Sequence, residues 1–373
     1  MLDSGSSAQG IGLAVLILLA ATMPAEAGTV GRAVGIRWEQ STLQLVQAGA
    51  GYGRMIRLDD EAILCLYERA GSVHARLSRD NARHWADETL VASYPFGTAA
   101  NPEALQLKDG RVMAMWNERP RDGMHHFAIR IAFSKDLGQT WANSQLVYQA
   151  SSKPHNGCWE PAAIQLPSGE IELFFANEYP YPHSNEQEIT MLRSHDDGAT
   201  WSGPETVSFR PGGRDGMPVP LVLNNRKGIV VAIEDSGDNG VLQPSIIYTS
   251  LSDDWKQGPA GANSPRRWPA VSGLDPHVYA GAPYIRQLPT GETILSCQST
   301  EGRTTDQMVV YIGDSQARNF AARSVPFQIR DGEKGQWNSL FVKDESTVTA
   351  ISSAVINGHY GLWAIDGYVI RAH

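Results

Sequence analysis

The chain has 373 residues, of which 42% are hydrophobic and 19% charged, so it is globular and long enough for two ordinary domains or one large all-β domain. Its 36 glycines and 21 prolines are too many breakers for a helical protein. The net charge of −9 argues against a nucleic-acid partner, because a surface that follows phosphates needs clustered Lys and Arg.

The first segment has the pattern of an export signal. Residues 11–23, IGLAVLILLAATM, are apolar over the length of a signal-peptide core and are too short to span a bilayer comfortably. The tripeptide AEA at 25–27 fits a cleavage site, although Asp3 stands in a region where a positive charge is usual. We expect residues 1–27 to be a signal peptide, with an uncleaved anchor as the alternative. Residues 28–373 would then form one secreted or periplasmic domain that is not in the membrane.

An eight-residue phrase recurs along the mature chain. SRDNARHW ends at Trp85, SKDLGQTW at Trp141 and SHDDGATW at Trp201, and weaker versions end at Trp255 and Phe320. In such a phrase Asp and Ser bond nearby backbone groups, Gly takes a positive φ, and the Trp packs between neighbouring strands. The phrase therefore predicts hairpin turns that belong to the scaffold.

A second phrase, a leucine followed by a turn and an apolar run, recurs out of step with the first. It starts at Leu58, Leu107, Leu166, Leu223 and Leu288, and in degraded form at Val342. Repeating units of roughly 50 to 65 residues made of short β-rich runs predict six four-stranded blades arranged radially, an all-β propeller. A β-sandwich array, the alternative, does not predict the same turn at a fixed phase in every unit. Residues 35–47, GIRWEQSTLQLVQ, are expected to pair with the last blade and close the ring.

The phrases SKDLGQTW and SHDDGATW resemble the Asp-box of the sialidase-like superfamily, which also contains propellers without enzymatic activity. Within it, the chain resembles the exo-arabinanase family, glycoside hydrolase family 93, over GCWEPAAIQLPSGEIELFFANEYPYPHSNEQEITMLRSHDDGATW, RDGMPVPLVL and VVAIED. This resemblance implies a six-bladed propeller, a carbohydrate substrate and a catalytic pair at Glu160 and Glu234. The second blade departs from the family, because ANPEALQL stands where an aspartate-rich segment is usual, and this bears on the substrate more than on the reaction.

The strand order of a unit predicts which face carries the chemistry. Each leucine turn joins two antiparallel strands, so the start of the first strand and the end of the second lie at one face, opposite the Asp-box turns. We select eleven residues of that face: Arg54, Asn101, Trp159, Glu160, Glu178, Arg214, Asp215, Glu234, Tyr284, Gln298 and Trp337. About half of such strand-end positions are expected to be ordinary rim residues that cap backbone groups.

Two carboxyl groups suit the cleavage of a glycosidic bond, since one protonates the leaving oxygen while the other attacks or activates water. We expect Glu160 to be the acid/base and Glu234 the nucleophile or base, with Tyr284 in support. Asp235 is expected to raise one pKa by crowding Glu234 with like charge. The other eight residues would bind the substrate, the aromatic ones by stacking on sugar rings.

Neither a metal nor another cofactor is predicted. His125 and His126 lack metal-ligand spacing, and the three cysteines, Cys65, Cys158 and Cys297, form no metal-spaced pair. Their odd number leaves at least one thiol unpaired within the monomer that we expect.

The predicted function is that of an exo-acting glycoside hydrolase on a plant or microbial glycan, most simply of arabinan type. An exo-sialidase is the first alternative: Arg54 and Arg214 fit two of its three arginines, whereas neither Arg286 nor Arg303 is convincing as the third. A lyase acting on a uronate-linked sugar is another. A glycan-binding propeller without catalysis is disfavoured, because a pure binder gains little from burying two like charges.

Overall fold

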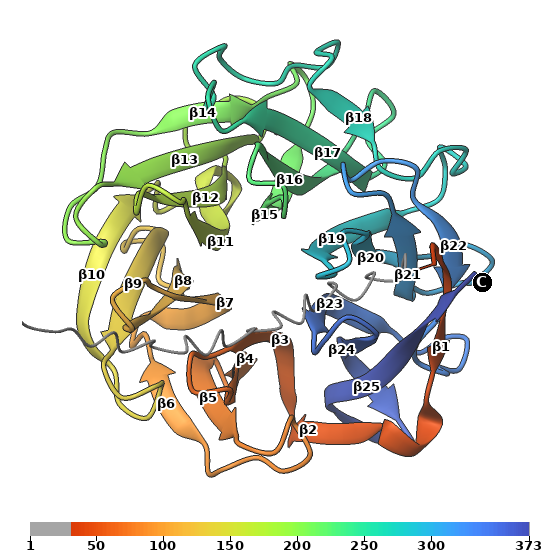
Figure 1. Cartoon of the computed structure of the whole chain (residues 1–373). Coiled ribbons are helices and arrows are strands. Elements are labelled where there is room, and N and C mark those ends of the chain that lie inside the picture. The colour runs from red at the N-terminus through yellow and green to blue at the C-terminus, as the bar shows by residue number, and fades with distance from the viewer. Residues whose placement is uncertain (1–30, 373) are drawn as a thin grey trace, which may run out of the picture.

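The computed structural model describes residues 31–372. It contains six small antiparallel sheets arranged as blades around a common axis (Figure 1). The chain is therefore an all-β, six-bladed propeller, as the two repeats predict. The predicted signal peptide lies outside the described residues, and within them no helix is long and apolar enough to cross a membrane.

The strands of each blade run in chain order from the axis outward. Blade 1 contains β3 (Ala50–Arg57), β4 (Ile63–Arg69), β5 (Ser72–Ser78) and β6 (Thr89–Ala92). Blade 2 contains β7 (Gly97–Gln106), β8 (Val112–Pro120), β9 (Ala128–Ser134) and β10 (Ala142–Gln149). Blade 3 contains β11 (Cys158–Gln165), β12 (Ile171–Asn177), β13 (Glu188–Ser194) and β14 (Glu205–Ser208).

Blades 4 and 5 repeat this arrangement, and the chain ends in blade 6. Blade 4 contains β15 (Asp215–Val222), β16 (Gly228–Asp235), β17 (Gln243–Ser250) and β18 (Arg267–Pro269). Blade 5 contains β19 (Ala280–Gln287), β20 (Thr293–Ser299), β21 (Gln307–Gly313) and β22 (Ala321–Ser324). Blade 6 contains β23 (Gly335–Val342), β24 (Thr347–Ile356) and β25 (His359–Arg371). Two short 3-10 turns, η1 (Gln40–Thr42) and η2 (Pro154–Asn156), lie outside the blades.

The start of the chain closes the ring. Strands β1 (Ala33–Trp38) and β2 (Gln44–Ala48) both pair antiparallel with β25, as Figure 1 shows beside the C-terminus. The prediction that residues 35–47 complete the last blade is confirmed. A blade shared by the two ends of the chain leaves no gap in the ring through which a sheet edge would be exposed.

The hydrophobic core lies between the blades. The middle strands β12 and β20 are buried along their whole length, because each is covered by a neighbouring blade on both faces. Large side chains such as Phe174 and Phe175 therefore point to opposite faces of β12 and pack into different inter-blade clusters.

The Asp-box phrases form the predicted turns. Ser194 Oγ donates to Asp196 Oδ1 at 2.8 Å, the same oxygen accepts Thr200 N at 2.8 Å, and Gly198 has φ of 85°. Asn177 pairs with Glu188 and Ile171 with Ser194, so this turn lies at the end of the blade opposite the start of β11. The boxes are scaffold, and the face where the inner strands begin, called here the mouth face, is the opposite one.

Candidate active site

Every inner strand carries a bulge at the same position. The pairing register between the first and second strands shifts there by one residue in all six blades. The bulge residues, all with positive φ between 45° and 56°, are Tyr52, Asn101, Glu160, Met217, Ala282 and Trp337. Because a bulge re-aims its side chain, these residues form a ring at the mouth face that includes one of the two predicted catalytic glutamates.

The ends of the second strands bond to this ring. Ser353 Oγ accepts Tyr52 N at 3.0 Å and Gln298 Oε1 accepts Trp337 N at 2.9 Å, in each case from the next blade. Glu234 Oε2 accepts Ala282 N at 2.9 Å in the same way. This recurring bond fixes the Glu234 carboxylate between blades 4 and 5.

Glu160 is held similarly between blades 3 and 4, where its Oε2 accepts Met217 N at 3.2 Å. The Oε1 atoms of Glu160 and Glu234 make no hydrogen bond to residues 31–372, so one oxygen of each carboxyl is free to meet a ligand. Both side chains are half-buried. The structure thus places the two glutamates at the mouth ends of neighbouring blades.

Their electrostatics show that they interact. Burial and then the charge of Glu234 raise the pKa of Glu160 to about 8, against the opposing effects of Arg119, the Met217 N–H and Arg54. Burial also raises the pKa of Glu234, which the Ala282 N–H and Arg214 partly offset. The two carboxyl groups therefore titrate as a coupled pair, in which the charge of Glu234 disfavours the ionisation of Glu160.

Asp235 does not crowd Glu234, so that expectation is wrong. Neighbouring residues of a strand point to opposite faces, and Asp235 faces Arg267 at 2.7 Å and Arg210 at 3.2 Å. Burial is the largest single effect and acts to raise the pKa of Asp235, but the charge of Arg267, the Gly237 N–H and the hydrogen bonds from Arg267 and Arg210 together lower it. The like charge that acts on Glu160 is Glu234 itself.

Asp215 is likewise turned away from the mouth. It is fully buried, accepts a hydrogen bond from Ser208 Oγ at 2.6 Å and pairs with both terminal nitrogens of Arg267. Its role is to hold blade 4 together, and the structure does not support its selection as a substrate-binding residue.

Arg54 and Tyr284 lie one step deeper along the axis than the bulge ring. The Tyr284 hydroxyl donates to Glu103 Oε2 at 3.0 Å and accepts from Arg286, and it makes no hydrogen bond to Glu160 or Glu234. Arg54 is 2% exposed, and its Nε lies 3.6 Å from Glu103 Oε2. The structure therefore places Tyr284 beneath the glutamate pair, away from direct contact with it.

A small pocket opens beside Glu160 and is called here the mouth pocket. Its lining includes Tyr52, Arg54, Glu103, Glu160 and Met217. The Arg54 guanidinium lies over the Tyr52 ring at 3.9 Å and closes its floor. Arg54 thus shares a pocket with Glu160, whereas Glu234 is not among the lining residues.

Glu178 and Arg214 form an ion pair of 2.5 Å between blades 3 and 4. Glu178 is buried and also accepts Gly157 N at 3.2 Å, whereas the Arg214 side chain is 38% exposed. Arg214 acts on the pKa of Glu234 from this position. Arg214 is therefore exposed at the mouth face and oriented by Glu178 and by Asn185 O, which accepts from its other terminal nitrogen at 2.8 Å.

Asn101 and Gln298 are both buried and bonded to neighbouring side chains. Gln298 Nε2 donates to Tyr279 OH at 2.6 Å while its oxygen binds Trp337 N, and Asn101 Oδ1 accepts from Arg119. Gln298 presents no free polar atom to a substrate, whereas Asn101 Nδ2 makes no hydrogen bond to residues 31–372.

The two predicted aromatic contacts differ. Trp159 packs on Phe127 with ring centroids 4.9 Å apart, beneath Arg119, and belongs to the core between blades. Trp337 is 37% exposed and lies 6.1 Å from the Tyr52 ring. Of the two, Trp337 offers the free face that stacking on a sugar requires.

Sequence reasoning missed Glu103, Arg119 and Tyr279. Arg119 follows Glu118 at the end of a second strand and Tyr279 directly precedes β19, so the strand-end rule places both at the mouth face. Arg119 lowers the pKa of Glu160, and the charge of Glu234 acts on Tyr279. Glu103 had no such signal, because the unforeseen bulge at Asn101 turns it toward the axis.

Among residues 31–372, one acidic cluster has metal-ligand spacing: Glu170, Glu172 and Asp254. Arg193 Nη1 already contacts all three carboxylates, at 2.7, 3.2 and 2.8 Å. The guanidinium occupies the position that a cation would take. The cluster also lies at the box-turn end of the blades, far along β12 from the glutamate pair.

Comparison with known proteins agrees with this architecture. Residues 110–265 match the BNR repeat-like domain. An α-L-arabinanase of Penicillium chrysogenum, solved with arabinobiose, is 16% identical with a TM-score of 0.69, over 91% of this chain and 98% of that one. The chain shares the propeller fold of this enzyme.

Two further structures share the propeller. An α-L-arabinofuranosidase of Fusarium graminearum is 17% identical with a TM-score of 0.66, over 92% of this chain and 98% of that one. A sialidase of Streptococcus pneumoniae is 10% identical with a TM-score of 0.58, over 91% of this chain and 70% of that one. No curated protein matches the chain. At these identities the likeness establishes the fold of this propeller, and its function has to be argued from the site.

Proposed function

We propose that this propeller is an exo-acting glycoside hydrolase whose reaction is carried out by Glu160 and Glu234. The observation that carries the proposal is the pair itself: two half-buried glutamates of neighbouring blades, each with one oxygen fixed by a backbone N–H and the other free. In the proposed reaction Glu160 is the protonated acid and Glu234 the ionised partner that glycosidic cleavage needs.

The proton distribution supports a division of roles. Glu160, with a pKa of about 8, carries the proton at neutral pH and suits the protonation of the leaving oxygen. Glu234 faces Arg214 and the Ala282 N–H, which favour its ionised form, and it would act as nucleophile or as base toward water. Trp337 would stack on the sugar ring, and Arg214 would bind its hydroxyl groups.

A neutral sugar fits the site better than sialic acid. A sialic acid carboxylate would need three converging arginines, but Arg54 is buried against Glu103 and Arg303 donates to the backbone oxygens of residues 329 and 330. Arg286 lies below Tyr284 on the far side of the Arg54 and Glu103 pair. Arabinan is the proposed substrate class, in line with the arabinobiose complex of the Penicillium propeller.

The test is hydrolysis of arabinan, sialyl-lactose and a uronate-containing glycan by the purified mature protein, with products identified by mass. We expect release of a saturated arabinose-containing product that carries one added water. An unsaturated uronate would reveal a lyase, and release of sialic acid would establish the sialidase alternative.

Variants assign the roles. Glu160→Gln and Glu234→Gln should each lower turnover by at least about two orders of magnitude. Glu118→Gln is the matched control, because this mouth-face glutamate lies 3.4 Å from Arg130 and outside the pair. If Glu160 is the acid, its Gln variant should keep activity toward a substrate with a good leaving group; retention of that activity by Glu234→Gln instead would reverse the two roles.

Export and a monomeric state belong to the same proposal. They are supported by the apolar segment at 11–23 and the AEA tripeptide, and by the ring that the chain completes by itself. N-terminal sequencing of protein recovered outside the cytoplasm should give a start after residue 27. Light scattering after size exclusion should give the mass of one chain.

A further inference from the structure

A second cavity lies along the axis, at the end opposite the mouth pocket, and is called here the back cavity. It has a volume of about 290 Å³ and is lined by the later residues of β3, β7, β11 and β15 together with Arg286 of β19. Glu103, Ala162 and Val219 line both this cavity and the mouth pocket. The two are therefore adjoining compartments, separated by the layer that contains Glu103.

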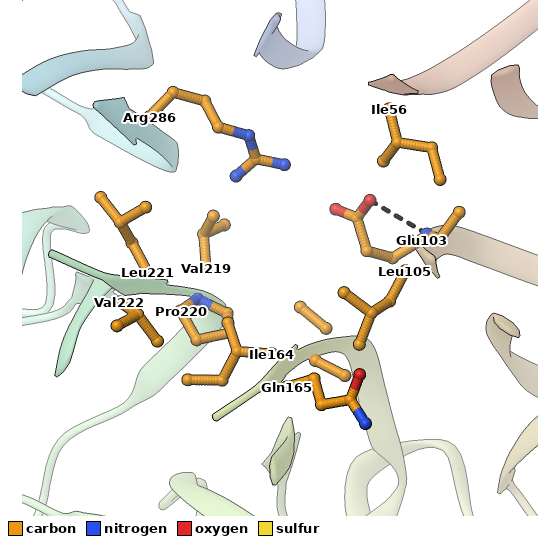
Figure 2. A pocket seen from close by; sticks show the side chains of 13 residues that line it. Ile56, Glu103, Leu105, Ile164, Gln165, Val219, Pro220, Leu221, Val222 and Arg286 are labelled. Carbon is orange, nitrogen blue, oxygen red and sulfur yellow. Dashed lines mark hydrogen bonds between the residues drawn. The ribbon is translucent and has the colours of Figure 1, made fainter. Parts of the chain in front are cut away.

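The walls of the back cavity are mainly apolar. Figure 2 shows Leu105, Ile164, Val219 and Leu221 around the space, with the guanidinium of Arg286 pointing into it. An apolar enclosure with a few fixed polar groups is the usual form of a small-molecule site, and this volume is close to the lower end of that class, roughly 300 Å³.

Arg286 has no ion-pair partner in the described part of the chain. One of its terminal nitrogens donates to Ile285 O at 2.9 Å and the other to Tyr284 OH, and no carboxylate oxygen lies within 4.0 Å of the guanidinium. The nearby carboxylate of Glu103 is instead paired with Arg54. Arg54, Arg286 and Glu103 together give this layer one positive charge in excess.

Arg286 is half-buried against apolar walls and has no counter-ion, so an anion that enters this space would gain charge-assisted hydrogen bonds from it. We propose that the back cavity binds a small organic monoanion, a carboxylate on an apolar body, with the carboxylate on Arg286 and the apolar part among the branched side chains of β7, β11 and β15. A planar guanidinium suits a carboxylate because it can donate two parallel hydrogen bonds. The proposal is independent of the hydrolase reaction.

The experiment uses the full mature chain and benzoate as the probe, followed by calorimetry and by thermal shift. Benzoate should bind saturably at one site, and benzamide, which has the same shape without the charge, should bind at least about tenfold more weakly. Benzylamine should not bind. Equal affinity for benzoate and benzamide would overturn the proposal, as would the absence of saturable benzoate binding up to about 10 mM.

Two kinds of variant locate the probe. Arg286→Met removes the charge and should abolish benzoate binding, Arg286→Lys should keep part of it, and Arg83→Met, an exposed arginine of the box-turn face, should have no effect. Leu221→Phe fills the cavity without changing the charge and should also block the probe. Benzoate binding that survives Arg286→Met and Leu221→Phe but is lost in Arg214→Met would place the anion at the mouth and contradict the proposal.

Discussion

Replacement of Glu234 by Gln should lower the pKa of Glu160. That pKa stands at about 8 instead of the ordinary 4.5, a rise of about 3.5, and burial contributes more of it than the charge of Glu234 does. The amide keeps the size of the side chain and removes the charge. The pKa of Glu160 should therefore fall below about 8, toward the ordinary value, because the charge of Glu234 is removed while burial, the larger cause, remains.

The assay is a pH titration of the carboxyl carbon of Glu160 by NMR, with glutamate labelled and the resonance assigned from Glu160→Gln. Glu118→Gln should leave the titration of Glu160 unchanged, because Glu118 does not act on Glu160. An unchanged midpoint in Glu234→Gln would show that the two carboxyl groups do not interact, and the division of roles argued from their coupling would then be wrong.

Three other changes test the scaffold and the rim. Trp201→Ala should lower the free energy of unfolding by roughly 3 kcal/mol, the lower end for a tryptophan, because Trp201 is partly buried. Activity per folded molecule should survive. Denaturant unfolding and active-site titration measure the two. Burial and the neighbouring Asp254 raise the pKa of Glu172 to about 9. The stabilisation that its bound proton gives is therefore complete below about pH 4.5 and is lost as the pH rises through about 9. Glu172→Gln should flatten the fall of Tm from pH 5 to 9. Trp337→Ala should raise KM with little change in kcat, whereas a loss confined to kcat would contradict a stacking role.

The repeats predicted the architecture because they encode local chemistry. Ser194, Asp196 and Trp201 form the same turn wherever their phrase occurs, so the number of blades and the orientation of the faces follow from counting. The strand-end rule then brought Glu160 and Glu234 to one face from sequence alone.

What the sequence did not reveal depends on the bulges and on long-range partners. One extra residue at Asn101 or Ala282 changes which later side chains face the axis, and this turns Glu103 and Tyr284 into the layer below the pair. Four of the six bulge residues precede a proline, as in Asn101-Pro102, and this is the one signal that the sequence offers. Asp215 was misjudged because its partner, Arg267, lies 52 residues away on the outermost strand of the blade.

The most direct test of the central claim is the turnover of arabino-oligosaccharides by Glu160→Gln and Glu234→Gln, measured beside substrate binding by calorimetry and with Glu118→Gln as control. If these two glutamates carry out the reaction, both variants should lose at least about a hundredfold in kcat while the Kd for the substrate stays within a few-fold of the unmodified protein. Normal turnover by both Gln variants would contradict the account and leave a propeller that binds glycan without cleaving it at this pair.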